Sequence, residues 1–239
     1  MKILLLGGIG EAKRLSRKLS QNHQVIYSLK GGVRIPTDVT CEIRVGGFGG
    51  VDGLVTFLRE QQIDLLIDAT HPYSVGMSSN ARLAAQQFGV ELWSYVRPPW
   101  QPQPNDKWTV VQGLKSLFAQ LQNYRRPLFT IGSKFLNELK AVPAHQHWLV
   151  RGYFPCPLTS KEVTLINELG PFDLQHEQQL FASNDIDVLV SKNSGGHAVD
   201  AKLQVARERG LPVLMLARPD KPKGSRVFTS LQPMLDLLA

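Results

Sequence analysis

The sequence has few cysteines and no long apolar runs, two features that would indicate a class of protein directly. It contains two cysteines, Cys41 and Cys156, too few and too widely separated for a disulfide framework or a cysteine metal site. No apolar run approaches the ~20 residues that span a bilayer, and the opening apolar run stops at Gly7 and Gly8 without a signal-peptide pattern. We therefore expect a protein of the reducing cytoplasm with no membrane partner and no disulfide.

Common catalytic and nucleic-acid-binding patterns are missing as well. The chain has no G-x-S-x-G elbow, no Walker loop and no H-E-x-x-H pair, so neither a serine triad nor a bound metal is expected. Its 27 basic and 20 acidic residues give a net charge of +7, but no run of five like charges occurs. Nucleic-acid-binding proteins more often carry a basic stripe or a known module. The excess positive charge therefore favours a small anionic ligand and no nucleic acid.

What the chain does contain is a regular alternation of short apolar runs with amphipathic segments. Its 239 residues suffice for one or two domains. Four prolines between residues 98 and 104 mark a stiff boundary. The pattern predicts an α/β protein with two Rossmann-like domains, residues 1–105 and 106–239, whose mainly parallel sheets face a shared cleft.

The first turn is a candidate phosphate site. An apolar run over residues 2–6 is followed by Gly7, Gly8, Ile9, Gly10 and Glu11, and then by a helical pattern. Glycines there would let the backbone approach a phosphate at the helix amino end. The full G-x-G-x-x-G is absent, so the signal is weak, and a glycine turn without a ligand is the alternative.

The second apolar run, residues 25–29, ends at Lys30-Gly31-Gly32, followed by Arg34. A site for NAD usually has an acidic residue here that accepts the ribose 2′-hydroxyl. Basic residues stand there instead and favour a 2′-phosphate, although surface lysines in loops are usually just solvated.

Polar residues also follow later apolar runs. The run from Ile63 to Ile67 ends at Asp68, and the next residues include Thr70, His71, Tyr73 and Ser74. Open α/β sheets build sites at such strand ends, while an ordinary turn capped by Asp68 or Thr70 is the alternative. A second such end is Ser191–Gly196, where Lys192 could neutralise a carboxylate or phosphate or be solvated. Asn193 and Ser194 there would serve as helix caps by default.

Six motifs follow one another along the chain: Arg44-Val45-Gly46-Gly47-Phe48-Gly49-Gly50, Asp68–Ser74 with Asn80, Arg97-Pro98-Pro99-Trp100, Gly170-Pro171-Phe172 with Glu177, Lys192–Gly196 and Ala217-Arg218-Pro219. This ordered set resembles the precorrin-6A reductase family of cobalamin biosynthesis, which includes cobalt-precorrin-6A reductases. The resemblance implies transfer of a hydride from NADPH or NADH to the anionic precorrin-6A macrocycle, giving precorrin-6B. Ile9 stands where the family usually has a threonine, and Lys30-Gly31-Gly32 where it often has Ala-Gly-Arg.

Together, the residues and the resemblance predict three groups of site residues. Cofactor binding is assigned to Gly7, Gly8, Ile9, Gly10, Glu11, Lys30, Gly31, Gly32, Thr130 and Gly132; substrate binding to Phe48, Thr70, Ser74, Asn80, Ser191, Asn193, Ser194 and Gly195; catalysis to His71, Tyr73 and Lys192. The proton donor is left open among His71, Tyr73 and water. Another NAD(P)H-dependent reductase on the same fold, or a nucleotide-binding regulatory module without turnover, is the alternative reading.

Overall fold

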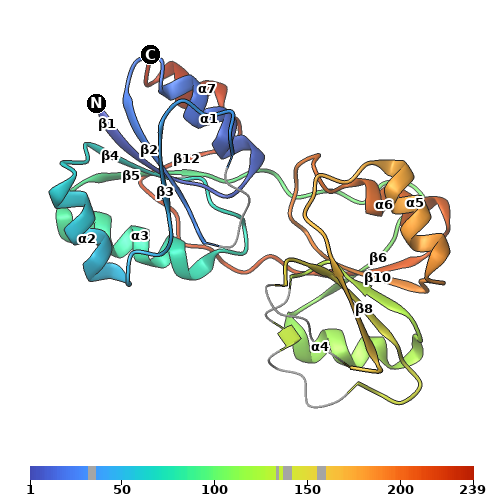
Figure 1. The fold of residues 1–239 in the computed structure, drawn as a ribbon. Coiled ribbons are helices and arrows are strands. Elements are labelled where there is room, and N and C mark those ends of the chain that lie inside the picture. The colour runs from blue at the N-terminus through green and yellow to red at the C-terminus, as the bar shows by residue number, and fades with distance from the viewer. Residues whose placement is uncertain (32–35, 133–134, 137–141, 155–159) are drawn as a thin grey trace. The chain divides into compact units, whose positions relative to one another are not determined.

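The computed structural model describes residues 1–31, 36–132, 135–136, 142–154 and 160–239, in two compact units. Unit 1 combines Met1–Pro98 with Pro219–Ala239, and unit 2 is Pro99–Arg218. Each unit contains one six-stranded sheet in which the neighbouring strands run parallel, with helices on both faces (Figure 1). The predicted fold class, α/β with mainly parallel sheets, is therefore confirmed.

The sheet of unit 1 has the strand order β3-β2-β1-β4-β5-β12, the doubly wound order of dinucleotide-binding folds. Helices α1 and α7 cover one face and α2 and α3 the other (Figure 1). The elements are β1 (Lys2–Leu6), α1 (Gly10–Leu19), β2 (Gln24–Leu29), β3 (Glu42–Val45), α2 (Val51–Glu60), β4 (Leu65–Asp68), α3 (Val75–Phe88), β5 (Glu91–Tyr95), β12 (Arg226–Phe228) and α7 (Gln232–Asp236).

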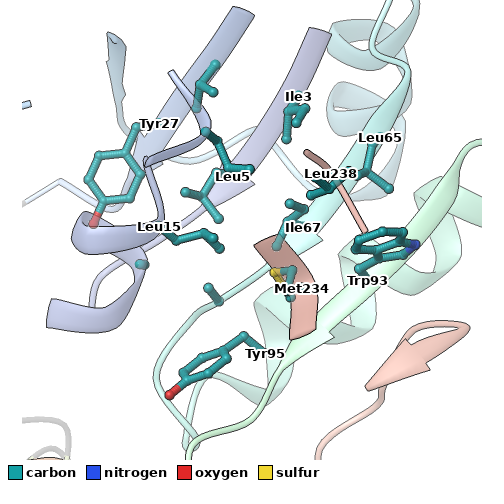
Figure 2. Close-up of a cluster of buried hydrophobic side chains, with 14 of the residues drawn as sticks. Ile3, Leu5, Leu15, Tyr27, Leu65, Ile67, Trp93, Tyr95, Met234 and Leu238 are labelled. Atoms are coloured by element: carbon teal, nitrogen blue, oxygen red, sulfur yellow. The ribbon is translucent and has the colours of Figure 1, made fainter. Parts of the chain in front are cut away.

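Successive side chains along the strands of unit 1 point to opposite faces of the sheet and belong to two apolar clusters. In β1, Ile3 and Leu5 belong to the cluster under α1 and α7, whereas Leu4 and Leu6 belong to the cluster under α2 and α3. Figure 2 shows the first cluster, in which strand residues meet side chains of α1 and of the carboxyl-terminal segment. Burial on both faces explains why these strands read as continuous apolar runs.

Unit 2 has the strand order β9-β8-β7-β10-β11-β6. Helix α4 packs on the face that carries Phe129 and Val190, and α5 and α6 pack on the face that carries Leu128 and Leu189. The elements are β6 (Lys107–Val111), α4 (Gly113–Gln120), η1 (Leu121–Asn123), β7 (Pro127–Phe129), β8 (Trp148–Gly152), β9 (Val163–Asn167), α5 (Leu174–Ser183), β10 (Val188–Lys192), α6 (Ala201–Glu208) and β11 (Pro212–Leu216).

The predicted domain ranges need correction at both ends of the second domain. Residues 99–105 belong to unit 2, and residues 219–239 return to unit 1. There β12 pairs in parallel with β5, Phe228 packs 5.2 Å from Trp93 between ring centroids, and Met234 and Leu238 are buried in the first cluster. The returning segment thus pairs with β5 and covers the apolar face beside it.

Candidate functional site

The predicted site residues fall into two groups, one at the carboxyl edge of each sheet. In unit 1, Leu6 pairs with both Ser28 and Asp68, so the segments after β1, β2 and β4 leave the same edge. In unit 2, Val190 pairs with Phe129, which brings the ends of β7 and β10 together. Lys192 Nζ lies 3.9 Å from the position that a Cβ would take at Gly132. Gly32 lies outside the described residues.

The glycine turn after β1 has the geometry of an anion-binding turn. A Cβ at Gly7 would lie 2.1 Å from Cε2 of the buried Tyr27, so only glycine fits there. Gly8 has φ +124°, which favours glycine. Helix α1 begins at Gly10, and its N-cap residue Ile9 makes no side-chain capping bond. The N–H groups of the first turn therefore face the turn without a side-chain cap, as phosphate-binding helix ends do.

Glu11 is paired within unit 1. Its Oε2 lies 3.3 Å from Arg97 Nη1, and the two side chains are about one-tenth exposed. Burial lowers the pKa of Arg97, and the charge of Glu11 opposes that effect. The pair neutralises an acid at the amino end of α1, which would otherwise repel a phosphate there. Glu11 is thus paired within unit 1, and its assignment to cofactor binding stays a prediction.

A buried polar cluster lies at the end of β4. Asp68 Oδ1 accepts from Thr70 N at 3.0 Å and Thr70 Oγ1 at 2.7 Å, while Asp68 Oδ2 accepts from Ser78 Oγ at 2.5 Å. Lys221 Nζ lies 3.3 Å from Asp68 Oδ2 and 3.0 Å from Thr70 Oγ1. All four residues are buried. Thr70, predicted to bind substrate, has its hydroxyl engaged in this cluster and fixes the start of the loop.

Lys221 is the residue of this cluster that the sequence interpretation missed. It lies in the segment Asp220-Lys221-Pro222-Lys223, which reads as a solvated loop. No local pattern links it to Asp68, because the contact depends on the return of the chain to unit 1 after residue 218. A buried lysine in such a segment shows only in the folded chain.

His71 and Tyr73 lie next to each other in the loop that the cluster anchors. Tyr73 N donates to His71 Nδ1 at 3.2 Å, and the two ring centroids are 5.6 Å apart. Both side chains are half-buried, as are Ser74 and Asn80 near the start of α3. Because Nδ1 accepts, a neutral His71 carries its proton on Nε2. That nitrogen is a chemically suitable proton donor.

The Phe48 loop has a structural explanation of its own. Arg44 donates to the carbonyls of Gly46 and Gly47, both at 2.8 Å, and its guanidinium carbon lies 3.9 Å from the Phe48 ring centroid. Phe48 also meets Phe57 edge-on at 5.2 Å between centroids. The ring is therefore packed within unit 1, and its predicted contact with substrate stays a prediction.

At the end of β10, Asn193 holds two distant segments of unit 2. Its Oδ1 accepts from Trp100 N at 2.8 Å, and its Nδ2 donates to Trp100 O at 3.0 Å. Arg218 Nε donates to Asn193 O at 2.7 Å. The expectation that Asn193 or Ser194 caps the next helix is wrong, because α6 begins after Asp200. The first and last segments of unit 2 are thus tied to the loop that follows Lys192.

The remaining predicted residues of unit 2 line the same strand ends. Thr130 Oγ1 donates to the carbonyl of Val190 at 3.0 Å, and Ser191 Oγ donates to the carbonyl of Lys192 at 3.1 Å. Ser194 and Gly195 are buried, and Lys192 is half-buried. The hydroxyls therefore stabilise strand ends, and Lys192 Nζ lies beside Gly132 at this edge.

Other site types find little support in the described residues. No group of three His, Cys, Asp or Glu side chains among them could hold a metal ion. No helix within the described ranges is long and apolar enough to cross a membrane. Two surface hollows of unit 1, of about 640 and 760 Å³, are lined by described residues outside the predicted site, Lys221 among them. The strand ends remain the places where the predicted site residues converge.

Parallel sheets with a glycine turn and polar strand ends place the chain among the doubly wound α/β proteins. Residues 2–239 match the family model of the precorrin-6x reductase CbiJ/CobK, and the chain belongs to this family. It is 39% identical over 225 residues to a precorrin-6A reductase of Rhodobacter capsulatus, covering 92% of this chain and 89% of that one. It is 27% identical to a cobalt-precorrin-6A reductase of Salmonella typhimurium, covering 91% and 87%.

The solved structure of a CobK precorrin-6A reductase superposes with a TM-score of 0.89 at 36% identity. The match covers 100% of this chain and 96% of that one. The family resemblance predicted from the ordered motifs is therefore confirmed over the whole chain.

Proposed function

We propose that the protein reduces precorrin-6A to precorrin-6B with a hydride from a reduced nicotinamide dinucleotide. Family membership over residues 2–239 carries this proposal. Relatives named precorrin-6A reductase reach 39% identity, whereas those named cobalt-precorrin-6A reductase reach 27% and 25%. The difference favours the metal-free macrocycle as the substrate.

The glycine turn of unit 1 supports dinucleotide binding. The uncapped amino end of α1 and the backbone of Gly8 suit the pyrophosphate of a dinucleotide. At the end of β2, Lys30 and Gly31 stand where an NAD site usually has an acidic residue. Lys30 is exposed and free to swing towards a 2′-phosphate. These features favour NADPH over NADH.

The chemistry divides between cofactor and chain. A reduced nicotinamide supplies the hydride. The chain must bind the dinucleotide and the macrocycle, orient them, and supply the proton that follows the hydride. His71 Nε2 is our candidate for the proton that follows the hydride, with its ring oriented by Tyr73 N. Lys192 is our candidate for binding a substrate carboxylate at the carboxyl edge of unit 2. The acidic side chains of the macrocycle fit the net charge of +7.

The deciding assay incubates the purified protein with precorrin-6A and either NADPH or NADH. We expect the absorption spectrum of the tetrapyrrole to change and nucleotide to be consumed in equal amounts, faster with NADPH. Consumption of nucleotide without tetrapyrrole would indicate a different reductase. Tight nucleotide binding with no turnover of either compound would indicate a regulatory module and refute the proposal.

A further inference from the structure

The loop that carries His71 is held at both ends by one buried carboxylate of unit 1. Asp68 Oδ1 accepts from the amide and the hydroxyl of Thr70, the residue directly before His71, at 3.0 and 2.7 Å. Asp68 Oδ2 accepts from Ser78 Oγ, near the start of α3, at 2.5 Å. The Thr70 and Ser78 hydroxyl oxygens lie 3.5 Å apart. The segment from Thr70 to Ser78 is thereby closed on the end of β4.

Lys221 joins this carboxylate to the backbone directly before His71. Its Nζ lies 3.3 Å from Asp68 Oδ2 and donates to Thr70 Oγ1 at 3.0 Å and to the Thr70 carbonyl at 3.3 Å. The side chains of Lys221 and Asp68 are 6% and 1% exposed. Because the Thr70 carbonyl belongs to the peptide bond between Thr70 and His71, the ammonium holds the backbone from which the imidazole projects.

The neutral donors around Asp68 do not replace the charge of Lys221. An ionised carboxylate accepts at both oxygens, whereas a protonated carboxyl group donates from one of them. A buried carboxylate that lacks a counter-charge takes up a proton instead. One Asp68 oxygen would then donate, and the bond that it accepts from Thr70 or Ser78 would be lost or reversed. The closed loop therefore depends on the cation.

Bonds within the loop fix the His71 ring on its own backbone. Tyr73 N donates to His71 Nδ1 at 3.2 Å, and Ser74 N donates to the His71 carbonyl at 2.8 Å. Pro72 between them is buried. The ring thus moves with the loop, and the position of the loop on the sheet is set by Asp68.

Strand β4 lies where the strand order of unit 1 reverses. β1 stands between β2 and β4, Leu6 pairs with Asp68, and Ala69 N donates to the Leu6 carbonyl at 2.9 Å. Doubly wound sheets bind their ligands at such a switch point. The glycine turn after β1 and the His71 loop leave this point from neighbouring strands. A shift of the loop therefore changes how His71 is aimed at a ligand bound there.

We propose that Lys221 is a positioning residue, which acts through Asp68 and Thr70 to align His71 for proton transfer to the macrocycle. The proposal rests on the proposed function. In that step His71 Nε2 gives its proton to the carbon that receives the displaced π electron pair of the reduced double bond, keeps the N–H bonding pair, and regains a proton from water. Lys221 lies 151 positions from Thr70, on the segment that returns to unit 1 after Arg218. Alignment of the donor thus depends on a residue outside its own loop.

A double-mutant cycle tests whether Lys221 acts through His71. Lys221→Met should lower kcat for precorrin-6A about ten- to a hundredfold, the size expected when a reacting group is displaced by about 1 Å, and leave the Kd for NADPH unchanged. In a His71→Gln background the same change should lower kcat no further, because the donor that it positions is absent. Rates are expressed per folded molecule, counted by bound NADPH. The matched control, Lys223→Met, removes an exposed lysine and should leave kcat unchanged.

The His71 ring offers a second measurement that needs no turnover. In nitrogen NMR spectra of labelled protein, a neutral ring that accepts at Nδ1 shows one unprotonated Nδ1 and one protonated Nε2 resonance. Lys221→Met should move both resonances towards a mixture of tautomers, whereas Lys223→Met should not; His71→Gln assigns the signals. If Lys221→Met does not fold, Ser78→Ala replaces it in both measurements, because it opens the other end of the loop and keeps the ion pair.

Independent effects would overturn the proposal. If Lys221→Met lowers kcat by the same factor with and without His71, or lowers only the number of folded molecules, the lysine is structural. Wild-type kcat or unchanged His71 resonances in the folded variant also refute the positioning role. If the resonances move as expected but the wild-type protein does not reduce precorrin-6A, Lys221 still positions the ring and the proposed function alone fails.

Discussion

Replacing Lys221 with methionine tests the buried cluster at the end of β4. The change removes an ammonium that lies 3.3 Å from Asp68 Oδ2 and 3.0 Å from Thr70 Oγ1. Asp68 is 1% exposed, and without Lys221 its carboxylate would accept hydrogen bonds from neutral donors only. Breaking a buried ion pair from one side costs about 3–5 kcal/mol, because it leaves an uncompensated charge. We expect a loss of that size in the free energy of unfolding of unit 1.

The loss is measured by hydrogen exchange of β1 and β4 peptides in rising urea, which reports on unit 1 separately. The control is Lys223→Met, two residues further on at an exposed position, which should change stability by less than about 0.5 kcal/mol. Adding Asp68→Asn to Lys221→Met should cost less than the sum of the single changes, because no charge is then left buried. If Lys221→Met costs no more than Lys223→Met, the ion pair does not hold this loop.

Three further changes test other parts of the structure. Gly7→Ala should destabilise unit 1 by about 1–3 kcal/mol in urea unfolding, because its Cβ would overlap the Tyr27 ring. Arg44→Ala should speed proteolytic cleavage in the Gly46–Gly50 loop, because two carbonyl contacts and the packing on Phe48 are lost. Wild-type protein should gain stability relative to Lys202→Met between pH 7 and 10.5, by at most about 5 kcal/mol.

The direction of the pH effect follows from the proton balance. Burial lowers the pKa of Lys202 to about 7 in the folded protein from 10.5 in the unfolded chain, so the unfolded chain binds more protons between these values. A constant difference between the two proteins over this range would contradict the lowered pKa. The control for Gly7→Ala is Gly10→Ala, since a Cβ at Gly10 meets open space. The control for Arg44→Ala is Arg59→Ala, which removes an arginine of α2 outside the Gly46–Gly50 loop.

The sequence predicted most of what depends on local pattern. The runs that became β1, β2 and β4 are apolar because parallel strands are buried on both faces. Edge strands were missed: β6 is largely exposed, with Val110 at 61%, and β12 has three residues. Their pairing depends on distant strands and leaves little periodicity to read. The return of residues 219–239 to unit 1 has the same cause.

In the candidate site, too, the features that depend on local pattern were predicted and those that depend on long-range contacts were not. The positions of Gly7 and Lys192 at strand ends follow from motif and spacing, and the structure places both at carboxyl edges. The hydrogen-bond and ion-pair partners of each side chain could not be predicted from the sequence. Asn193 holds the backbone of Trp100, and Asp68 holds Lys221, across 93 and 153 positions respectively. Such partners are chosen by topology, so the sequence marks the edge but not the role of each residue.

The discontinuity of unit 1 has a consequence for how the protein is made. Unit 2 is one continuous stretch, Pro99–Arg218, whereas unit 1 needs Met1–Pro98 together with Pro219–Ala239. During synthesis from the amino terminus, β5 therefore waits for its partner β12 while all of unit 2 emerges from the ribosome. All residues of unit 2 are therefore synthesised before unit 1 is complete. Trp93 and the clustered side chains around it stay uncovered until Phe228, Met234 and Leu238 are translated, which makes this interval the point at which the nascent chain most needs protection from aggregation.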